Sequence, residues 1–102
     1  MSGAATAHIN LHALAQNLEL VRSVVPQSRI LSIIKANAYG HGIIQTARAL
    51  AAADGFGVAR LSEATLLRRA GIAKPVVLLE GFFDARELAR SRELGLSVVV
   101  HS

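Results

Sequence analysis

A lysine follows the first buried apolar run of this 102-residue chain. Lys35 comes directly after Ile30–Ile34, a run that is aliphatic at every position except one serine. Such a run is typical of a strand covered on both faces, and ligands bind at the carboxyl ends of parallel strands. A lysine there can form a Schiff base with a carbonyl compound, aldehyde cofactors included. From position alone, a lysine that merely extends into solvent is the favoured alternative.

The loop after Lys35 adds further polar groups. Gly40 and Gly42 flank His41 and permit tight backbone turns, and a helix is expected to begin just after them. Backbone amides at that helix start could hold an anion such as a phosphate. The hydroxyl of Tyr39 could add a hydrogen bond, although a loop tyrosine is more often packing. His41 could be a general base, or it could simply satisfy backbone groups in the turn.

Alternating apolar runs and helical stretches predict the elements that position these residues. The four expected strands are Ile30–Ile34, Phe56–Ala59, Val76–Leu79 and Leu96–Val100. Apolar residues spaced by three and four predict helices before and between them, at 11–25, 43–51, 63–70 and 85–94. Repeated βα units of this kind indicate parallel strands joined by right-handed crossovers. Thr6–Asn10 is expected to form one more short strand.

Capping residues mark the ends of the expected helices. The N-cap candidates are Asn10, Ser62 and Asp84, and the last of these forms a capping box with Glu87. Three glycines, each followed by an apolar residue, are expected to end helices because glycine adopts the left-handed conformation at no steric cost: Gly55, Gly71 and Gly95.

Composition excludes several classes of protein. With 52% apolar and 18% charged residues the chain is not a disordered tail, and without cysteine it has no disulfide or thiolate metal site. His8 and His12 are four residues apart, but no third ligand accompanies them, so no metal is expected. The longest apolar run, Ala49–Ala53, is too short to span a bilayer, and the first residues do not resemble a secretory signal. We therefore expect a cytoplasmic protein that does not bind membranes.

The charge pattern does not favour a nucleic-acid partner. The net charge is +4, but the arginines are spread along the chain, and only four aromatic residues are present. A nucleic-acid site needs a clustered basic patch and usually aromatic platforms. Two architectures fit the βα pattern: an open doubly wound sheet, or part of an eightfold barrel that needs about 250 residues when complete. The pattern alone leaves both open.

One motif resembles a known family. The octet Lys35–Gly42, KANAYGHG, matches at all eight positions the signature around the cofactor lysine of alanine racemases. The resemblance extends along the chain, through 10–18, 56–64 and 75–83. It implies an α/β fold that is the first half of a (β/α)8 barrel, preceded by a short N-terminal strand. Residues 1–102 would then be an incomplete N-terminal part of the pyridoxal-phosphate-binding barrel domain, without the C-terminal β domain.

The resemblance also implies roles for individual residues. Lys35 would carry pyridoxal 5′-phosphate as an internal aldimine and act as one of two bases that interconvert L-alanine and D-alanine. Its face of the substrate α-carbon is the one tied to the D-enantiomer. Tyr39 would hydrogen-bond the cofactor phosphate. Ile33 and Leu79 would be apolar walls near the pyridoxal ring.

The rest of such a site would come from other sequence. In the family, the second base is a tyrosine from the C-terminal domain of the partner subunit in a homodimer, and most phosphate and carboxylate ligands lie later in the chain. The isolated chain is therefore expected to be inactive. Two-sided apolar strands with open edges also suggest a piece of a larger core. Two alternatives stay open, a non-catalytic pyridoxal-phosphate-binding barrel protein and a doubly wound nucleotide-binding domain.

Overall fold

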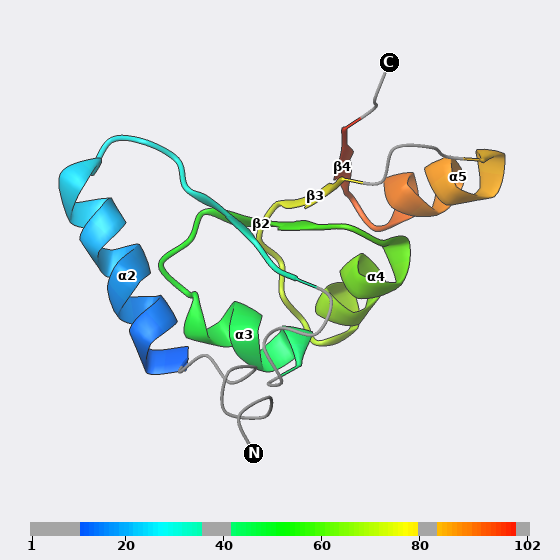
Figure 1. Ribbon diagram of the computed structural model, residues 1–102. Coiled ribbons are helices and arrows are strands. Elements are labelled where there is room, and N and C mark those ends of the chain that lie inside the picture. Colours follow the sequence, from blue (N-terminus) through cyan, green and yellow to red (C-terminus); the bar gives the residue numbers. More distant parts are fainter. Residues whose placement is uncertain (1–10, 36–41, 80–83, 100–102) are drawn as a thin grey trace.

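Four parallel strands and four helices alternate along the chain (Figure 1). The structure is a computed structural model that describes residues 11–35, 42–79 and 84–99. The strands are β1 Leu31–Ile33, β2 Gly55–Val58, β3 Val76–Leu78 and β4 Ser97–Val98. The helices are α2 Leu11–Val24, α3 Ile43–Ala49, α4 Leu61–Arg69 and α5 Ala85–Glu93. All eight correspond to predicted elements, whereas the expected strand Thr6–Asn10 lies outside the described residues.

The strands pair in sequence order, β1-β2-β3-β4, and every pair is parallel. Ile33 is the register partner of Gly57, which is in turn the partner of Val77. Because partners in a parallel ladder share a face, these three residues lie on one side of the sheet. Phe56 and Val76 form the neighbouring pair and lie on the other side. The sheet therefore has two faces of different composition.

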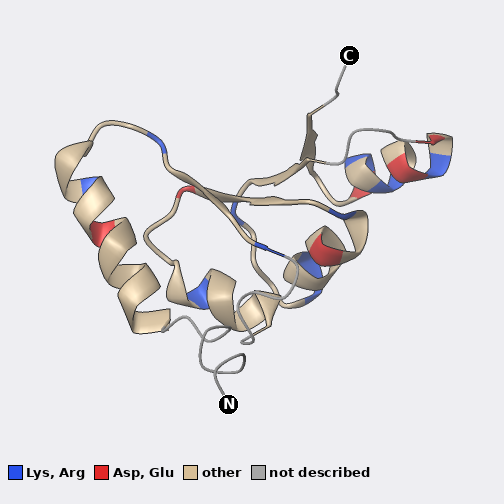
Figure 2. Ribbon diagram, viewed as in Figure 1, with Lys and Arg blue, Asp and Glu red and all other residues tan. Residues whose placement is uncertain are grey.

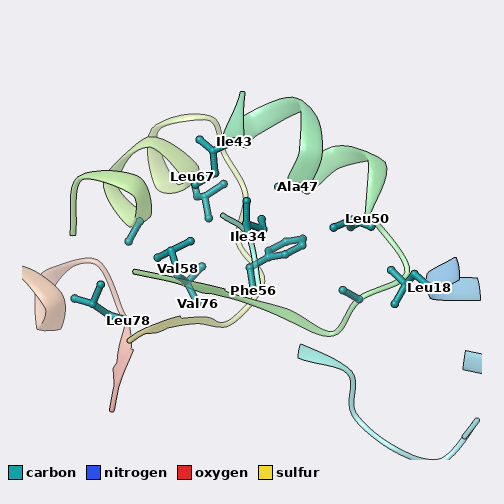
Figure 3. Close-up of a cluster of buried hydrophobic side chains, with 12 residues drawn as sticks. Leu18, Ile34, Ile43, Ala47, Leu50, Phe56, Val58, Leu67, Val76 and Leu78 are labelled. Carbon is teal, nitrogen blue, oxygen red and sulfur yellow. The ribbon is translucent and has the colours of Figure 1, made fainter. Parts of the chain in front are cut away.

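The hydrophobic core lies on the face that carries Phe56. Helices α3 and α4 lie on the same side of β2 (Figure 1), and apolar side chains fill the space between them and the strands (Figure 3). The largest fully buried side chains are Phe56, Leu67, Leu78, Val58 and Val76. Burial of side chains of this size stabilises a fold by about 1.5–3 kcal/mol each. This core fixes the strands whose ends position Lys35.

The opposite face is apolar but open. Leu31, Ile33 and Val99 are 43%, 50% and 41% exposed, and the register and alternation of the strands place all three on the face away from Phe56. An apolar face of a parallel sheet is normally covered. In a closed barrel this face would be the interior, filled by layers of side chains.

Three of the expected helix ends are confirmed, one at the start of α5 and one after each of α4 and α5. Asp84 Oδ1 accepts the N–H of Glu87 at 2.8 Å, and Glu87 Oε1 accepts the N–H of Asp84 at 3.0 Å, which is the predicted capping box. Gly71 and Gly95 follow α4 and α5 with φ angles of 83° and 65°. Both glycines therefore have the left-handed conformation expected after a helix.

Two expected ends are wrong, and Asn10 lies outside the described residues. Helix α4 begins at Leu61 with Arg60 as N-cap, so Ser62 is inside the first turn. The reason is that the Glu63 carboxylate accepts the N–H of Arg60 and fixes the start two residues earlier. Gly55 does not end α3, which stops at Ala49, but opens strand β2.

Gly55 has a packing role instead of a capping role. A Cβ atom at this position would lie 2.7 Å from the carbonyl oxygen of Pro75, which precedes the neighbouring strand β3. The N–H of Phe56 donates to that same carbonyl at 2.9 Å. Glycine is therefore needed for close approach of the two strands at this point.

Candidate functional site

The chain contains two lysines, and the structure gives them different surroundings. Lys74 Nζ donates hydrogen bonds to the carbonyls of Ala51 and Ala53 and lies 5.9 Å from the centre of the Phe56 ring. It thereby holds the turn after α3 against the start of β3. Lys35 is exposed and makes no hydrogen bond or ion pair with any residue of the described ranges. Of the two amines, Lys35 is the one left available for chemistry.

Lys35 stands at the carboxyl end of the sheet. It lies two residues beyond Ile33, the last residue of β1, and the N–H of Ile34 still donates to the carbonyl of Gly57 at 2.9 Å. Ile34 is buried on the core side, so alternation places Lys35 on the open face with Ile33. Lys35 therefore follows the end of β1 as predicted, but the expectation that this strand is buried on both faces is wrong for the described structure, because Leu31 and Ile33 are exposed on the open face.

Two further predicted residues, Ile33 and Leu79, come together on the open face. Both contact the space above Gly57: a Cβ there would lie 2.5 Å from Ile33 Cδ1 and 3.3 Å from Leu79 Cδ1. The two side chains reach over β2 from β1 and from the end of β3. Sequence reasoning identified Ile33 and Leu79 but missed Gly57, although a glycine inside a strand signals close approach of other atoms.

The turn after β2 is held by a buried carboxylate. Glu63 is 7% exposed, and its Oε1 accepts the N–H groups of Ala59 at 3.1 Å and Arg60 at 2.9 Å. Its other oxygen, Oε2, is buried without a hydrogen-bond partner among the described residues. This turn lies at the same carboxyl edge of the sheet as Lys35. Sequence reasoning missed this interaction because Arg60 is not one of the usual N-cap residues, so that only the glutamate three residues later could have signalled it.

Part of the predicted loop lies outside the described residues. Tyr39 and His41 belong to that part, whereas Gly42 is described and has a φ of 78°. This left-handed angle agrees with the tight turn expected from a glycine at the start of α3. The Gly42 carbonyl accepts hydrogen bonds from the N–H and the hydroxyl of Thr46 at 3.2 and 2.9 Å.

Charge and metal-binding groups do not form a second site in the part of the chain that is described. No cluster of three His, Cys, Asp or Glu side chains is placed to hold a metal within 11–35, 42–79 and 84–99. Figure 2 shows Lys and Arg distributed over several helices and loops instead of gathered on one element. None of the described helices is both long and apolar enough to cross a membrane.

Comparison with known families decides the assignment. Residues 9–102 match the family model described as "Alanine racemase, N-terminal domain". This chain belongs to the alanine racemase family. The biosynthetic alanine racemase of Escherichia coli K12 is 54% identical over 99 residues, and the alanine racemase of Yersinia pestis bv. Antiqua (strain Angola) is 52% identical over 99 residues. Each match covers 97% of this chain.

Solved alanine racemase structures match the fold. The Acinetobacter baumannii enzyme superposes with a TM-score of 0.81 at 41% identity, covering 93% of this chain and 27% of that one. The Bacillus anthracis enzyme, solved with bound L-Ala-P, also gives 0.81, at 28% identity, with 93% of this chain and 25% of that one. The four strands correspond to the N-terminal half-barrel of these alanine racemases. The barrel interpretation is therefore confirmed over the open doubly wound sheet.

The alanine racemase match is partial in length. The chain spans about 28% of the length of the curated relatives it matches.

Proposed function

We propose that residues 1–102 are the N-terminal part of the pyridoxal-phosphate-binding barrel domain of an enzyme that interconverts L-alanine and D-alanine. Lys35 is the attachment point of the cofactor and one of the two bases. Tyr39 binds the cofactor phosphate, and Ile33 and Leu79 form apolar walls near its ring. Membership of the alanine racemase family and the complete signature Lys35–Gly42 support this proposal.

The observation that carries the proposal is the contrast between the two lysines. A cofactor lysine needs an amine that is not already hydrogen-bonded, at the edge of the sheet where ligands bind. Lys35 meets both requirements among the described residues, whereas Lys74 is bonded to the carbonyls of Ala51 and Ala53. The open face beside Lys35 is apolar, and the half-exposed side chain of Ile33, which covers Gly57, offers a surface against which a flat ring can lie.

The residues present fit part of such a reaction. When bound, pyridoxal phosphate withdraws electrons from the α-carbon of the attached amino acid and acidifies its proton. Lys35 Nζ moves that proton on one face of the α-carbon. Inversion needs a second base on the opposite face, which we assign to a tyrosine of the partner subunit's C-terminal domain. We further propose that the active species is a homodimer of longer chains in the cytoplasm, with alanine as its small-molecule substrate.

A chimeric enzyme tests the proposed function. The 99 matched residues of the Escherichia coli enzyme, 28% of its length, are replaced by those of this chain. We expect the chimera to form D-alanine from L-alanine at a rate within about tenfold of the parent, because a difference of that size reflects only a small change in barrier. Lys35→Ala in the chimera should abolish the reaction, and Lys74→Ala should leave a measurable rate.

The outcomes of this experiment are separable. A folded, dimeric chimera that binds pyridoxal phosphate but forms no D-alanine would contradict the racemase proposal and favour a non-catalytic cofactor-binding barrel. Activity that survives Lys35→Ala would contradict the role of this lysine. Dimerisation is checked by sedimentation, and cofactor content by absorbance.

A further inference from the structure

Gly57 lies under two side chains from the neighbouring strands. A Cβ atom at residue 57 would come within 2.5 Å of Ile33 Cδ1 and 3.3 Å of Leu79 Cδ1. The first distance is shorter than any real contact between carbon atoms, whose optimum is about 3.5–4.0 Å. Ile33 therefore occupies the space in which a side chain of residue 57 would lie.

This arrangement has a simple geometric origin. Ile33 and Gly57 are register partners on the open face, so their side chains would stand next to each other. In a barrel interior, one layer is filled by side chains from alternate strands. Here β1 supplies Ile33, the end of β3 supplies Leu79, and β2 supplies no side chain. Gly57 thus allows the δ-methyl of Ile33 to lean across β2 although the residue as a whole is 50% exposed.

The position of Ile33 matters for Lys35 because the two residues are neighbours on one face. They are separated by one buried residue, Ile34, so their Cα atoms are about 6.6 Å apart along an extended chain. A lysine stem lies along adjacent apolar surface while its ammonium stays in water. Ile33 is the preceding side chain on the same face, so the Lys35 stem can lie along it.

We propose that Gly57 is a positioning residue for Lys35 and that it acts through Ile33. It keeps the Ile33 side chain seated over β2, which leaves the space above the open face to Lys35 and its ligand. A methyl group at residue 57 would force Cδ1 of Ile33 out of this seat and toward Lys35. This inference rests on the proposed function only where it concerns the cofactor, since the placement of the Lys35 amine can be measured without it.

The key variants are Gly57→Ala and Ile33→Val. Ile33→Val deletes Cδ1, the atom that a new Cβ at residue 57 would meet most closely, so the double variant should recover what Gly57→Ala loses. Gly55→Ala is the matched control on the same strand and face. Its Cβ would meet the carbonyl oxygen of Pro75 at 2.7 Å, a backbone contact that Ile33→Val cannot relieve.

Two readouts are measured in the protein as its gene encodes it. The first is the rate at which trinitrobenzenesulfonate labels Lys35 in the cofactor-free protein, relative to Lys74, followed by peptide mass. The second is the apparent Kd for pyridoxal phosphate from absorbance. We expect Gly57→Ala to slow labelling of Lys35 by about threefold and to weaken cofactor binding by about tenfold, which corresponds to about 1.4 kcal/mol.

Rescue decides between positioning and simple destabilisation. In both the labelling rate and the apparent Kd, the double variant Gly57→Ala/Ile33→Val should lie within about twofold of Ile33→Val alone. A difference of about twofold is small beside the loss of about tenfold in affinity expected for Gly57→Ala. Gly55→Ala should lower the thermal midpoint without changing the labelling ratio. Unchanged labelling in folded Gly57→Ala, or no recovery in the double variant, would overturn the inference.

A second pair of variants covers the case in which Gly57→Ala does not fold. Ile33→Ala removes the seated side chain and should change the Lys35 labelling ratio, whereas Leu31→Ala, also on the open face but two residues farther from Lys35, should not. Equal effects of the two would contradict the inference. If Lys35 labelling responds as expected but wild-type protein binds no pyridoxal phosphate, the proposed function fails and the positioning role of Gly57 stands.

Discussion

The guanidinium of Arg22 lies 2.6 Å from the carboxylate of Asp54, and this contact joins helix α2 to the residue before strand β2. The same carboxylate oxygen accepts the N–H of Ile30 at 2.6 Å, and Arg22 also donates to the carbonyls of Ser28 and Ala52. These bonds connect the segments that enter β1 and β2. They lie at the amino end of the sheet, opposite the edge that carries Lys35.

The Arg22–Asp54 contact predicts a pH dependence of stability. The hydrogen bond from Arg22, and after it the one from the N–H of Ile30, lowers the pKa of Asp54 below its usual 3.8. A lowered native pKa stabilises the fold above the unfolded pKa, and this stabilisation is lost as pH falls through the native value. We expect Asp54→Asn to lower the thermal midpoint at neutral pH and to differ less from wild type at the lowest pH. Circular dichroism melts from about pH 7 to about pH 2.5 test this, and a constant difference would contradict it.

Replacing Glu63, whose carboxylate holds the turn between β2 and α4, should lower the free energy of unfolding. Glu63→Ala leaves the N–H groups of Ala59 and Arg60 without this acceptor, so we expect a loss of about 1–3 kcal/mol in the free energy of unfolding. Glu63→Gln keeps one acceptor oxygen and should lose less. Glu93→Gln, on an exposed residue paired only with Arg90 among the described residues, should change stability by less than about 0.5 kcal/mol. Urea unfolding measures the free energy of unfolding of the three variants, and an equal loss in all three would contradict this role of Glu63.

At the carboxyl end of α4, the hydrogen-bonding geometry of Arg68 should matter for stability as well as its charge. Its guanidinium donates to four carbonyls, those of Ile72, Lys74, Leu94 and Gly95, at 2.7–3.2 Å. Lysine keeps the charge but cannot reproduce this planar fork, so Arg68→Lys should destabilise the fold by about 1–3 kcal/mol. The exposed neighbour Arg69 is the matched control, and Arg69→Lys should have almost no effect in the same unfolding measurement. Similar losses for the two would contradict this role.

The isolated chain is expected to lack racemase activity. Lys35 provides a base on one face only, and the second base of the proposed mechanism is not supplied by residues 1–102. An assay of D-alanine formed from L-alanine with pyridoxal phosphate present should therefore not exceed the value for Lys35→Ala. A rate above that control would show that these residues contain a complete site.

Most of the fold could be predicted from the sequence because its signals are local. The strand at Val76–Leu78 was indicated by an apolar run behind Pro75, and α5 by a capping box that is read directly from Asp84 and Glu87. Ser62 is the wrong cap because the Glu63 carboxylate accepts the N–H of Arg60 and starts the helix two residues before the start that a Ser62 cap would give. The residue that caps α4 depends on where strand β2 ends and the chain turns, and this is not a local property of the sequence.

The candidate site could be predicted only in part. Lys35 was recognisable because its neighbours Lys35–Gly42 form a contiguous motif, and Ile33 and Leu79 followed from resemblance to a family. The role of Gly57 depends on the strand register that places Ile33 beside it. That register is set by pairing between two strands that are distant in the sequence. The engagement of Lys74 with Ala51 and Ala53 is likewise a tertiary contact. Neither feature has a sequence pattern of its own.

The most direct test of the central claim is to trap the cofactor on its lysine. The protein is incubated with pyridoxal 5′-phosphate, reduced with borohydride, digested and mapped by mass spectrometry, with Lys35→Ala and Lys74→Ala as matched variants. We predict a reduced pyridoxyl group on Lys35 in wild type and in Lys74→Ala, and none in Lys35→Ala. A label on Lys74, or no label on either lysine, would contradict the assignment of Lys35 as the cofactor lysine.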